Sequence, residues 1–347
     1  MKHILLPDGC SDRRLVFYLS MEEYVAANLD HIAGEGGEAF FMWQVPPTVI
    51  FGRNQVMEAE VNMPYCREKG IQLYRRKSGG GCVYSDKGNI MLSFITPSTD
   101  VASTFERILE NLAAALRKAG LNAERSGRND ILVDGRKVSG NAYFLLPKSS
   151  IVHGTMLFNT DFEELVRAIT PSEEKIRSKG VASVRQHVTN VLPYFEKAEG
   201  WSRELSDIEA YKNYLIGEFC ATAEGVIDSV SLTADDVREI EEIEKGYLDP
   251  AFLEGRNHSY SVSRKAKIEG IGEIIAELEL DSGNILKCHV AGDFFAVREG
   301  IDTELTRLLA GCPDKKEEIE TRLAGADLAQ FIPGLTAETF AGILKNQ

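Results

Sequence analysis

Two arginines and three glycines stand close together in residues 75–81, a combination suited to binding polyanions. Arg75 and Arg76 carry forked guanidinium donors that match phosphate or carboxylate oxygens. Gly79 to Gly81 have no side chains and can adopt positive φ, so their backbone N–H groups can approach an anion closely. The segment predicts an anion-binding loop, and a hairpin turn with surface arginines is the alternative, because triple glycine is common in loops.

A lysine within residues 127–143 is the second candidate for chemistry. Asp134-Gly135 lies between two strand-like runs, which indicates a hairpin and places Lys137 on its returning strand. An amine on a buried wall can hold phosphate as a point charge and can also donate a hydrogen bond to a carbonyl oxygen. Lys137 is therefore a candidate catalytic or anchoring residue; the alternative is an ordinary exposed lysine on a strand.

Composition and charge narrow the class of protein. A length of 347 residues suggests two domains, and 44% apolar with 27% charged residues is typical of a soluble globular protein. The net charge of −14 argues against non-specific nucleic-acid binding. The chain starts without the apolar core of a signal peptide and has no run approaching eighteen apolar residues, so we expect a cytoplasmic protein with no membrane span. The cysteines lack CxxC spacing and the histidines are dispersed, so we expect reduced thiols and no zinc or structural metal site.

Periodicity and turn signals predict the elements that position these residues. The run 40–52 predicts a strand interrupted by Pro46-Pro47. The glycines open a strand pair near 81–84 and 89–95, and the Asp-Gly turn joins 130–133 to the strand that follows it. Helices are predicted at 12–29 with Ser11 as its cap, after Ser103 or Thr104 up to Gly120, and at 161–169, 172–178 and 206–220.

The pattern changes after a strongly acidic helix at 233–246, which we expect to be a solvated face or connector. Beyond it, alternating apolar residues predict strands around 274–280 and 286–290, joined by the turn 281–284. Short helices follow near 302–310, 313–323 and 336–344. We place a boundary between about 247 and 257, which gives a domain of residues 1–250 and a smaller one of residues 257–347.

These segments, in this order and at these separations, resemble the lipoate–protein ligase family. The resemblance covers essentially the whole chain. It is carried by GRNQ at 52–55, EVN at 60–62, RR and SGGG within 75–83, GRND at 127–130, GRK and the SG and AY pairs within 135–143, HGT at 153–155, SKG and SVR within 178–185, and GDFF at 292–295.

The resemblance implies an α/β (α+β) fold: a mixed-sheet catalytic domain like those of biotin ligases and class II aminoacyl-tRNA synthetases, with a small α+β C-terminal accessory domain. It also implies a two-step reaction with ATP, Mg²⁺ and lipoate. Lipoate is first converted to lipoyl-AMP, with release of pyrophosphate. The lipoyl group then passes to a lysine of a lipoyl-carrier domain, as in 2-oxoacid dehydrogenase E2 subunits and the glycine cleavage H protein. A monomer that binds neither nucleic acid nor membrane is expected.

The same resemblance assigns roles to individual residues. Lys137 is the expected catalytic residue and would contact both the α-phosphate and the lipoyl carbonyl oxygen. The expected nucleotide site consists of Arg76, Gly81, Cys82, Val83, Tyr84, Lys137, Asn129 and Asp130. The expected lipoate site consists of Lys137, His153, Arg75, Ser78, Gly80 and Ala142, and Phe51, Val83 and Tyr84 are further candidates to line an apolar tunnel.

Several of these roles have alternatives. Asp130 is a candidate Mg²⁺ ligand or a partner that orients Lys137, but an aspartate that stabilises the turn fits as well. His153 fits either a pocket wall or an ordinary core histidine. Lys179 and Arg185 fit either phosphate ligands or solvated helix charges.

The chain also departs from the family pattern. Cys82 stands where alanine is usual, Val152 where a second histidine often precedes HGT, Ser85 where histidine is common, and Asn141 where serine is common. Several of these departures could alter the acyl pocket or the surface that meets the protein substrate, so substrate identity is less firmly indicated than reaction class.

Three rival functions follow from the same residues. Cys82, next to arginines that could lower its pKa, suggests an octanoyl or lipoyl transferase that works through a thioester without ATP. A relative that binds lipoate without catalysis is a second rival, against which the intact Lys137 and Arg76 count. Biotin ligase is a third, although the spacing of the GRND and GRK segments is closer to the lipoate branch.

Overall fold

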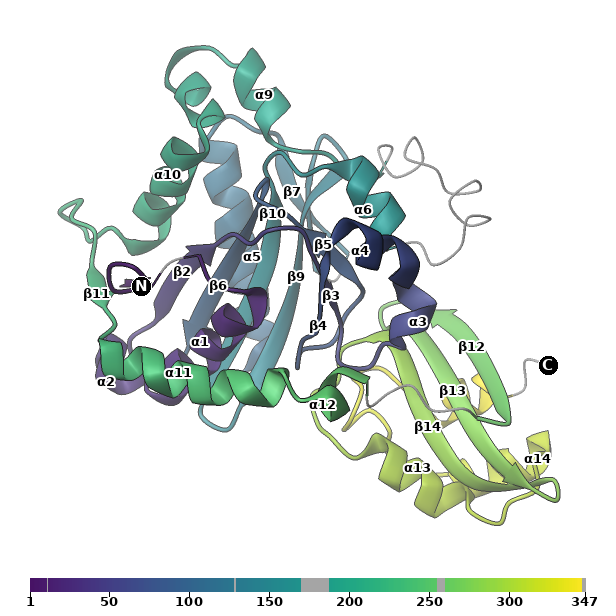
Figure 1. Ribbon diagram of the computed structural model, residues 1–347. Helices are drawn as coiled ribbons and strands as arrows, with labels where there is room; N and C mark the ends of the chain where they lie inside the picture. Colours follow the sequence, from purple (N-terminus) through teal and green to yellow (C-terminus); the bar gives the residue numbers. More distant parts are fainter. Residues whose placement is uncertain (11, 128, 170–186, 255–259, 345–347) are drawn as a thin grey trace.

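The structure, a computed structural model, describes residues 1–10, 12–127, 129–169, 187–254 and 260–344 of the chain. The predicted cap Ser11, the predicted helix 172–178, and Lys179 and Arg185 lie outside the described residues. The fold has a large mixed sheet, a small sheet beside it and a separate C-terminal unit (Figure 1).

The large sheet has eight strands in the order β11-β1-β2-β6-β10-β9-β8-β7. Its central strands are buried along their whole length, because both faces of the sheet are covered by helices. β1 pairs in parallel with β2 and β11, and the remaining pairs are antiparallel. The strands are β1 (Lys2–Leu5), β2 (Ala39–Trp43), β6 (Asn89–Thr96), β7 (Ala123–Ser126), β8 (Asp130–Val133), β9 (Arg136–Leu146), β10 (Ser149–Leu157) and β11 (Ser229–Ser231).

Alternate side chains of the central strands divide between two hydrophobic cores. On one face, Leu92 and Phe94 pack with α5 (Val101–Lys118). On the other, Met91 and Ile95 pack with α1 (Leu15–Ala27). Also associated with the first core are α9 (Leu192–Lys197), the 3₁₀ helix η1 (Gly200–Ser206) and α10 (Ile208–Cys220), and with the second α2 (Leu29–Ala33) and α11 (Ala234–Tyr247).

Two helix predictions need correction. The cap of α5 is Asp100 and not Ser103 or Thr104: its carboxylate accepts a hydrogen bond from the Ser103 backbone N–H at 3.2 Å. The helix does end before Gly120, which adopts φ 89°. The acidic helix α11 is solvated on one side only, because Val237 and Ile240 are buried in the core shared with α1.

The predicted strand 40–52 is broken at Pro46-Pro47, as expected, and its halves join different sheets. The predicted pairing of 81–84 with 89–95 is wrong. β5 (Val83–Ser85) pairs with β3 (Thr48–Phe51), whereas β6 pairs with β2 and β10, because its fully buried, apolar sequence requires neighbours on both sides. The small sheet has the order β4-β3-β5 and is completed by β4 (Gln72–Arg75); α3 (Met57–Glu60), α4 (Met63–Lys69) and α6 (Phe162–Ala168) accompany it.

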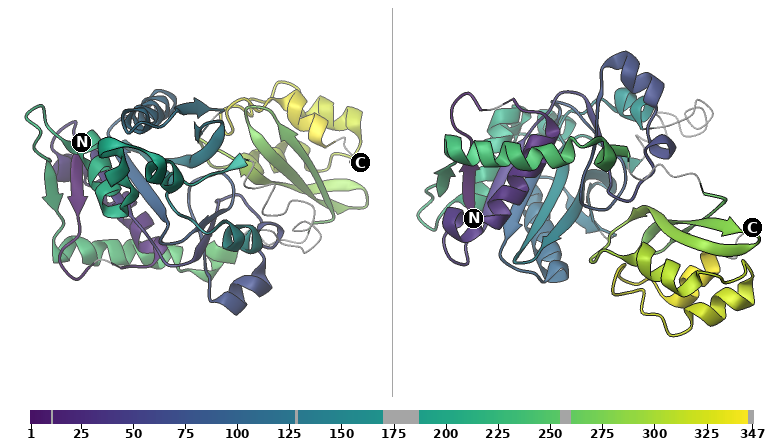
Figure 2. Two further views of the ribbon diagram at one scale, coloured as in Figure 1. Left: turned by 90° about the horizontal axis from the view of Figure 1, so that it is seen from above. Right: turned by 60° about the horizontal axis from the view of Figure 1, so that its bottom comes forward.

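Residues 260–344, called the accessory unit below, form a three-stranded antiparallel sheet packed on short helices (Figures 1 and 2). Its buried residues make their own core, in which Leu278 and Val290 meet Leu305 and Phe340. The elements are β12 (Val262–Ile268), β13 (Gly272–Asp281), β14 (Asn284–Phe294), α13 (Ile301–Leu309), α14 (Lys316–Leu323) and α15 (Ala337–Ile343), and α12 (Pro250–Glu254) precedes them. The large mixed sheet with its helices and the small α+β unit confirm the expected fold class. The predicted limits of the two domains stay a prediction.

None of the helices in the described part of the chain has the length and apolar character needed to cross a bilayer.

Candidate functional site

A cavity of about 590 Å³ opens between the large sheet, the small sheet and the accessory unit. Most of the residues singled out from the sequence border it, which brings together segments far apart in the chain. They are Arg76, Gly80, Gly81, Cys82, Val83, Tyr84, Asn129, Asp130, Lys137, Ala142 and His153. Apolar side chains from other segments complete the wall, among them Leu19, Trp43, Ile50 and Met91, which the sequence did not single out.

Lys137 is a cavity residue held by an acidic partner, not an unpaired surface lysine. Its Nζ lies 2.7 Å from Oδ1 of Asp130, which starts the neighbouring strand β8. The predicted hairpin is confirmed: Asp134 and Gly135 have φ of 49° and 74°, as a type I′ turn requires. The β8–β9 register shifts by one residue at Val138, and a bulge of this kind re-aims the side chains next to it.

Gly140 leaves space for that amine. A Cβ built on Gly140 would lie 2.7 Å from the Lys137 Nζ and 3.8 Å from the Asp130 carboxylate. The glycine two residues before Ala142 in this strand is therefore explained by the path of the lysine side chain across it. The carboxylate of Asp130 faces the Lys137 amine and borders the cavity. This position favours a partner of Lys137 or a Mg²⁺ ligand over an aspartate that only stabilises the turn.

Two asparagines tie the loop before β8 to strand β9. The Asn129 side-chain amide donates to the Asn141 carbonyl at 2.8 Å, and the Asn141 amide donates back to the Asn129 carbonyl at 3.1 Å. Gly154 on β10 accommodates Asn141, since a Cβ there would lie 1.9 Å from Asn141 Oδ1. Asn141, noted in the sequence only as a departure, thus helps to fix the cavity wall.

Arg76 lies inside the glycine loop and holds its shape. Its Nη2 donates to the carbonyls of Gly79 and Gly81 at 2.7 and 2.8 Å, and its Nε donates to Ser78 Oγ at 3.1 Å. Burial lowers the pKa of Arg76 to about 10, yet backbone carbonyls satisfy the guanidinium. The contact of Arg76 with phosphate stays a prediction. In this structure its N–H groups donate to atoms of the glycine loop.

Arg75 does not border the cavity. It is 1% exposed, and its Nη1 donates to the Gln55 carbonyl at 2.7 Å while its Nη2 donates to the Leu253 carbonyl at 3.0 Å. The guanidinium also stacks on Phe51 at 4.6 Å, so Phe51 packs beneath an arginine and is not part of the cavity wall. Arg75 thus joins strand β4 to the segment that leads into the accessory unit, and its predicted lipoate contact has no support in this geometry.

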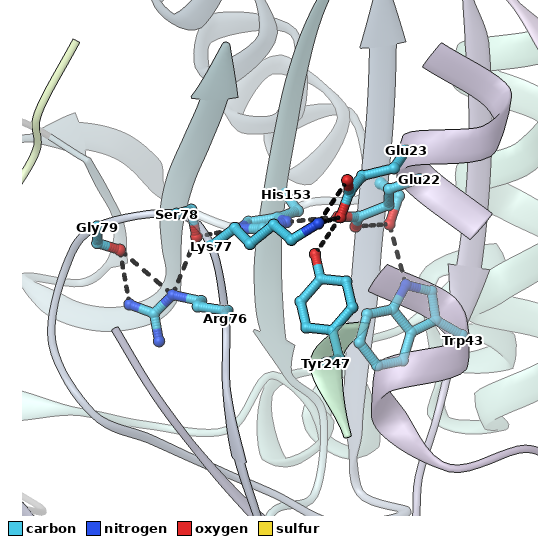
Figure 3. Close-up of polar contacts among 10 residues, drawn as sticks. Glu22, Glu23, Trp43, Arg76, Lys77, Ser78, Gly79, His153 and Tyr247 are labelled. Atoms are coloured by element: carbon cyan, nitrogen blue, oxygen red, sulfur yellow. Dashed lines mark hydrogen bonds and ion pairs between the residues drawn. The ribbon is translucent and has the colours of Figure 1, made fainter. Parts of the chain in front are cut away.

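A buried hydrogen-bond chain connects the loop to helix α1 (Figure 3). His153 Nε2 lies 2.8 Å from Ser78 Oγ, and His153 Nδ1 lies 2.7 Å from Glu22 Oε2. Glu22, 2% exposed, accepts in addition from Ser93 Oγ at 2.5 Å. His153 is therefore both a cavity wall and a fixed core residue. Ser78 does not border the cavity itself but hydrogen-bonds two residues that do, His153 and Arg76.

A second cluster in the same view links Lys77 to Glu23, the residue after Glu22 in α1. The Lys77 amine lies 2.8 Å from the carboxylate of Glu23, which also accepts from the Tyr247 hydroxyl at 2.5 Å (Figure 3). Sequence reasoning missed both glutamates. Two adjacent acids in the otherwise apolar run 15–21 and 24–27 were the available signal.

Cys82 borders the cavity but is not poised as a nucleophile. Its pKa is raised, because burial disfavours the thiolate and Glu60 adds negative charge, and these effects outweigh the attraction of Arg76. The expectation of a lowered thiol pKa was therefore wrong. Adjacent arginines were not enough, because the guanidinium of Arg76 is turned to backbone carbonyls.

The accessory unit docks directly on the glycine loop. The Gly80 N–H donates to the Phe294 carbonyl at 3.1 Å, and the Gly292 N–H donates to the Asn54 carbonyl at 2.8 Å. A Cβ on Gly79 would lie 2.2 Å from the Phe294 carbonyl oxygen. The Phe295 ring stacks on Tyr143 with centroids 5.3 Å apart. The backbone of β14 therefore approaches this loop so closely that glycine is required there, whether or not a ligand binds.

Comparison with known proteins gives the same family for both parts of the chain. Residues 15–219 match the model of the lipoyl protein ligase A/B catalytic domain, and residues 257–344 match that of the bacterial lipoate protein ligase C-terminus. The chain is 33% identical to the lipoate-protein ligase LplJ of Bacillus subtilis, with 94% of this chain and 95% of the relative covered. It is 34% identical to lipoate–protein ligase 1 of Staphylococcus aureus, with 90% and 91% covered.

Solved structures share the fold. A bipartite lipoate protein ligase of Thermoplasma acidophilum matches with a TM-score of 0.61 and 25% identity over 75% of this chain and 98% of that one. LipL1 of Plasmodium falciparum, solved in complex with lipoate, matches with a TM-score of 0.68 over 94% of each chain, and at 19% identity this likeness concerns the fold alone.

Substituting Gly140 with alanine should displace the Lys137 amine, because the new methyl group would occupy its position. We expect turnover to fall by about 10²-fold, the typical effect of losing one fixed donor in an active site, with little change in thermal stability. Gly217→Ala is the matched control, since a Cβ at Gly217 meets nothing within 4 Å. Steady-state kinetics of both variants would contradict this reading if Gly140→Ala behaved like the control.

Gly79→Ala should loosen the accessory unit without changing the loop's own conformation. Gly79 does not need positive φ, and the three atoms nearest to an added Cβ are backbone atoms of Phe294 and Phe295. Small-angle X-ray scattering should therefore show a larger radius of gyration than for the parent chain and for Gly217→Ala. An unchanged scattering curve, with the variant folded, would contradict the assigned docking contact.

Proposed function

This chain belongs to the lipoate–protein ligase family, and on that premise we propose that it activates lipoate with ATP and transfers the lipoyl group to a lysine of a lipoyl-carrier domain. The observation that carries the proposal is a single cavity bordered by the Lys137 amine, the glycine loop and a group of apolar side chains. Lipoate combines an apolar body with a terminal carboxylate, and the two kinds of wall match these two parts.

The apolar part of the wall supports an acyl chain as ligand. Leu19, Ile50 and Met91 supply aliphatic surface, and Trp43 adds a ring whose Nε1 donates to Ser93 Oγ at 2.9 Å, so its polar atom is already satisfied. Burying an apolar chain against such surface is favourable by about 25 cal/mol per Å². The volume of about 590 Å³ lies within the range of ordinary small-molecule pockets.

The polar part of the cavity wall supports the first proposed step, in which lipoate is activated by ATP. A lipoate carboxylate oxygen attacks the α-phosphorus of ATP, and the bond from that phosphorus to the bridging oxygen breaks, so that pyrophosphate leaves. Negative charge on the phosphoryl oxygens is stabilised by the Lys137 ammonium, which Asp130 orients at 2.7 Å. Holding carboxylate and phosphate together in one cavity supplies the proximity that a bimolecular reaction in water lacks.

The same amine serves the second step. The ε-amine of a carrier lysine attacks the carbonyl carbon of lipoyl-AMP, the carbon–oxygen bond to AMP breaks, and an amide forms. The negative charge that develops on the carbonyl oxygen is stabilised by a fixed cation nearby, and Lys137 is the candidate. The proposal includes the carriers expected from the resemblance, the 2-oxoacid dehydrogenase E2 subunits and the glycine cleavage H protein. It also includes the expectation that the protein is a monomer.

The residues present fit a magnesium ion that arrives with ATP. The described residues contain no group of three His, Cys, Asp or Glu side chains placed to hold a metal ion. Mg²⁺ typically uses one or two carboxylates together with phosphate and water oxygens, and Asp130 and Asp293 border the cavity. Bound there, the ion would neutralise phosphate charge.

The thioester transferase is the weaker candidate. It needs a thiolate at Cys82, and burial raises the pKa of that thiol. Pyrophosphate release on mixing the protein with ATP and lipoate decides between the two. Release that requires both supports the ligase, whereas consumption of octanoyl-carrier donors without ATP supports the transferase.

Lys137→Ala should abolish lipoate-dependent pyrophosphate release with the fold preserved, because it removes the cation assigned to stabilise the phosphoryl oxygens. No other cation is paired with Asp130 among the described residues. Lys148→Ala, in the exposed turn before β10, is the control and should keep parental rates. Circular dichroism would verify folding of both variants. Unchanged turnover in Lys137→Ala would show that the catalytic amine has been misassigned.

A further inference from the structure

We propose that the accessory unit contributes two residues to the activating half of the site: Lys267 as a ligand of the departing pyrophosphate, and Asp293 as a carboxylate on the Mg²⁺ side. Both border the same cavity as Lys137 and Asp130, although they lie on strands of the other unit. The inference rests on the proposed function, because it concerns the ATP-dependent step of that reaction.

Strand register places the two residues at one end of the accessory sheet. Lys267 of β12 stands opposite Glu273 of β13, and Glu273 stands opposite Asp293 of β14. Directly opposed residues point to the same face of a sheet. The residues that follow Glu273 and Asp293 on β13 and β14, Ile274 and Phe294, belong to the unit's own core. The charged row therefore lies on the face away from that core.

Backbone contacts fix Asp293 relative to the glycine loop. The Gly292 N–H, just before it, donates to the Asn54 carbonyl at 2.8 Å. The Phe294 carbonyl, just after it, accepts from the Gly80 N–H at 3.1 Å. The Asp293 carboxylate stands over the loop, with Oδ2 3.1 Å from the position of a Cβ on Gly81. A functional group must be held this firmly to act on a ligand.

Neither Lys267 nor Asp293 makes a side-chain hydrogen bond or ion pair within the described part of the chain. The Asp293 carboxylate lies close enough to the buried guanidinium of Arg76 to oppose the lowering of its pKa, but that guanidinium donates its hydrogen bonds to backbone carbonyls. The other lysines next to the loop and cavity behave differently, since Lys77 pairs with Glu23 and Lys137 with Asp130. A cation and a carboxylate that border one cavity with no hydrogen-bond or ion-pair partner among the described residues suit a ligand that carries its own charges, and a metal-bound polyphosphate is such a ligand.

The chemistry assigns these residues to the first step. Only that step involves the β- and γ-phosphates, which leave as pyrophosphate when the bond from the α-phosphorus breaks. The transfer step starts from lipoyl-AMP, which carries a single phosphate, and produces AMP. Loss of Lys267 or Asp293 should therefore impair activation and spare transfer. A residue with a merely structural role would impair both.

The test compares Lys267→Ala and Asp293→Asn with two controls. Lys265→Ala removes an exposed lysine from the same strand and face that does not border the cavity, and Asp281→Asn changes an exposed carboxylate at the far end of the sheet. Three quantities are measured: lipoate-dependent ATP–pyrophosphate exchange, transfer from chemically prepared lipoyl-AMP to a lipoyl domain, and binding of Mn²⁺ in the presence of ATP, followed by electron paramagnetic resonance. Thermal unfolding and scattering verify that each variant is folded and docked.

We expect exchange to fall by about ten- to a hundred-fold in both variants, the usual effect of losing one charge-assisted contact, while transfer stays within about two-fold of the parent. Asp293→Asn should also weaken Mn²⁺ binding by about ten-fold, which Lys267→Ala should not do. Parental exchange rates, or equal losses in both half-reactions, would overturn the inference. If the parent chain itself showed no lipoate-dependent exchange, the proposed function would fail instead, and the Mn²⁺ titration would still test Asp293.

Discussion

The site depends on keeping a side-chain-free loop rigid. Because Gly79 to Gly81 have no side chains, other groups can approach their backbone closely, but the loop also lacks side chains that could pack and hold its shape. Arg76 supplies what is missing: its buried guanidinium donates to the carbonyls of Gly79 and Gly81 from inside the loop. The Glu22–His153–Ser78 chain then anchors the same loop to α1. Charged groups are buried here because each has partners, which is the condition for tolerating them.

The two units of the chain meet on this loop, so that both border the one cavity to which we assign the two proposed steps. The catalytic part supplies the apolar wall and the paired amine of Lys137, and the accessory unit closes the cavity with the end of its sheet. Contacts such as Gly80 N–H to Phe294 carbonyl are backbone hydrogen bonds that form at a fixed geometry. The accessory unit is therefore positioned in part by main-chain atoms, alongside side-chain contacts such as the Phe295 ring on Tyr143, and this leaves the Asp293 side chain available to a ligand.

Local signals were readable in the sequence, and long-range ones were not. The hairpin carrying Lys137 follows from Asp134-Gly135, whose turn geometry is set by two neighbouring residues. Two adjacent acids in an apolar run marked Glu22 as unusual, but its partner His153, 131 positions away, could not be read from that run. The role of Gly79 in docking depends on a carbonyl in β14, and motif resemblance does not distinguish that role from ligand binding. Arg75 and Arg76 look alike in sequence, yet only one of them reaches the cavity.

A crystal structure of the protein with a non-hydrolysable lipoyl-adenylate analogue tests the central claim most directly. The account predicts that Lys137 Nζ lies within hydrogen-bonding distance of both a phosphate-side oxygen and the acyl carbonyl oxygen, with the acyl chain against Trp43. An analogue bound elsewhere, or a Lys137 amine that keeps only Asp130 as its partner and turns away from the ligand, would contradict it.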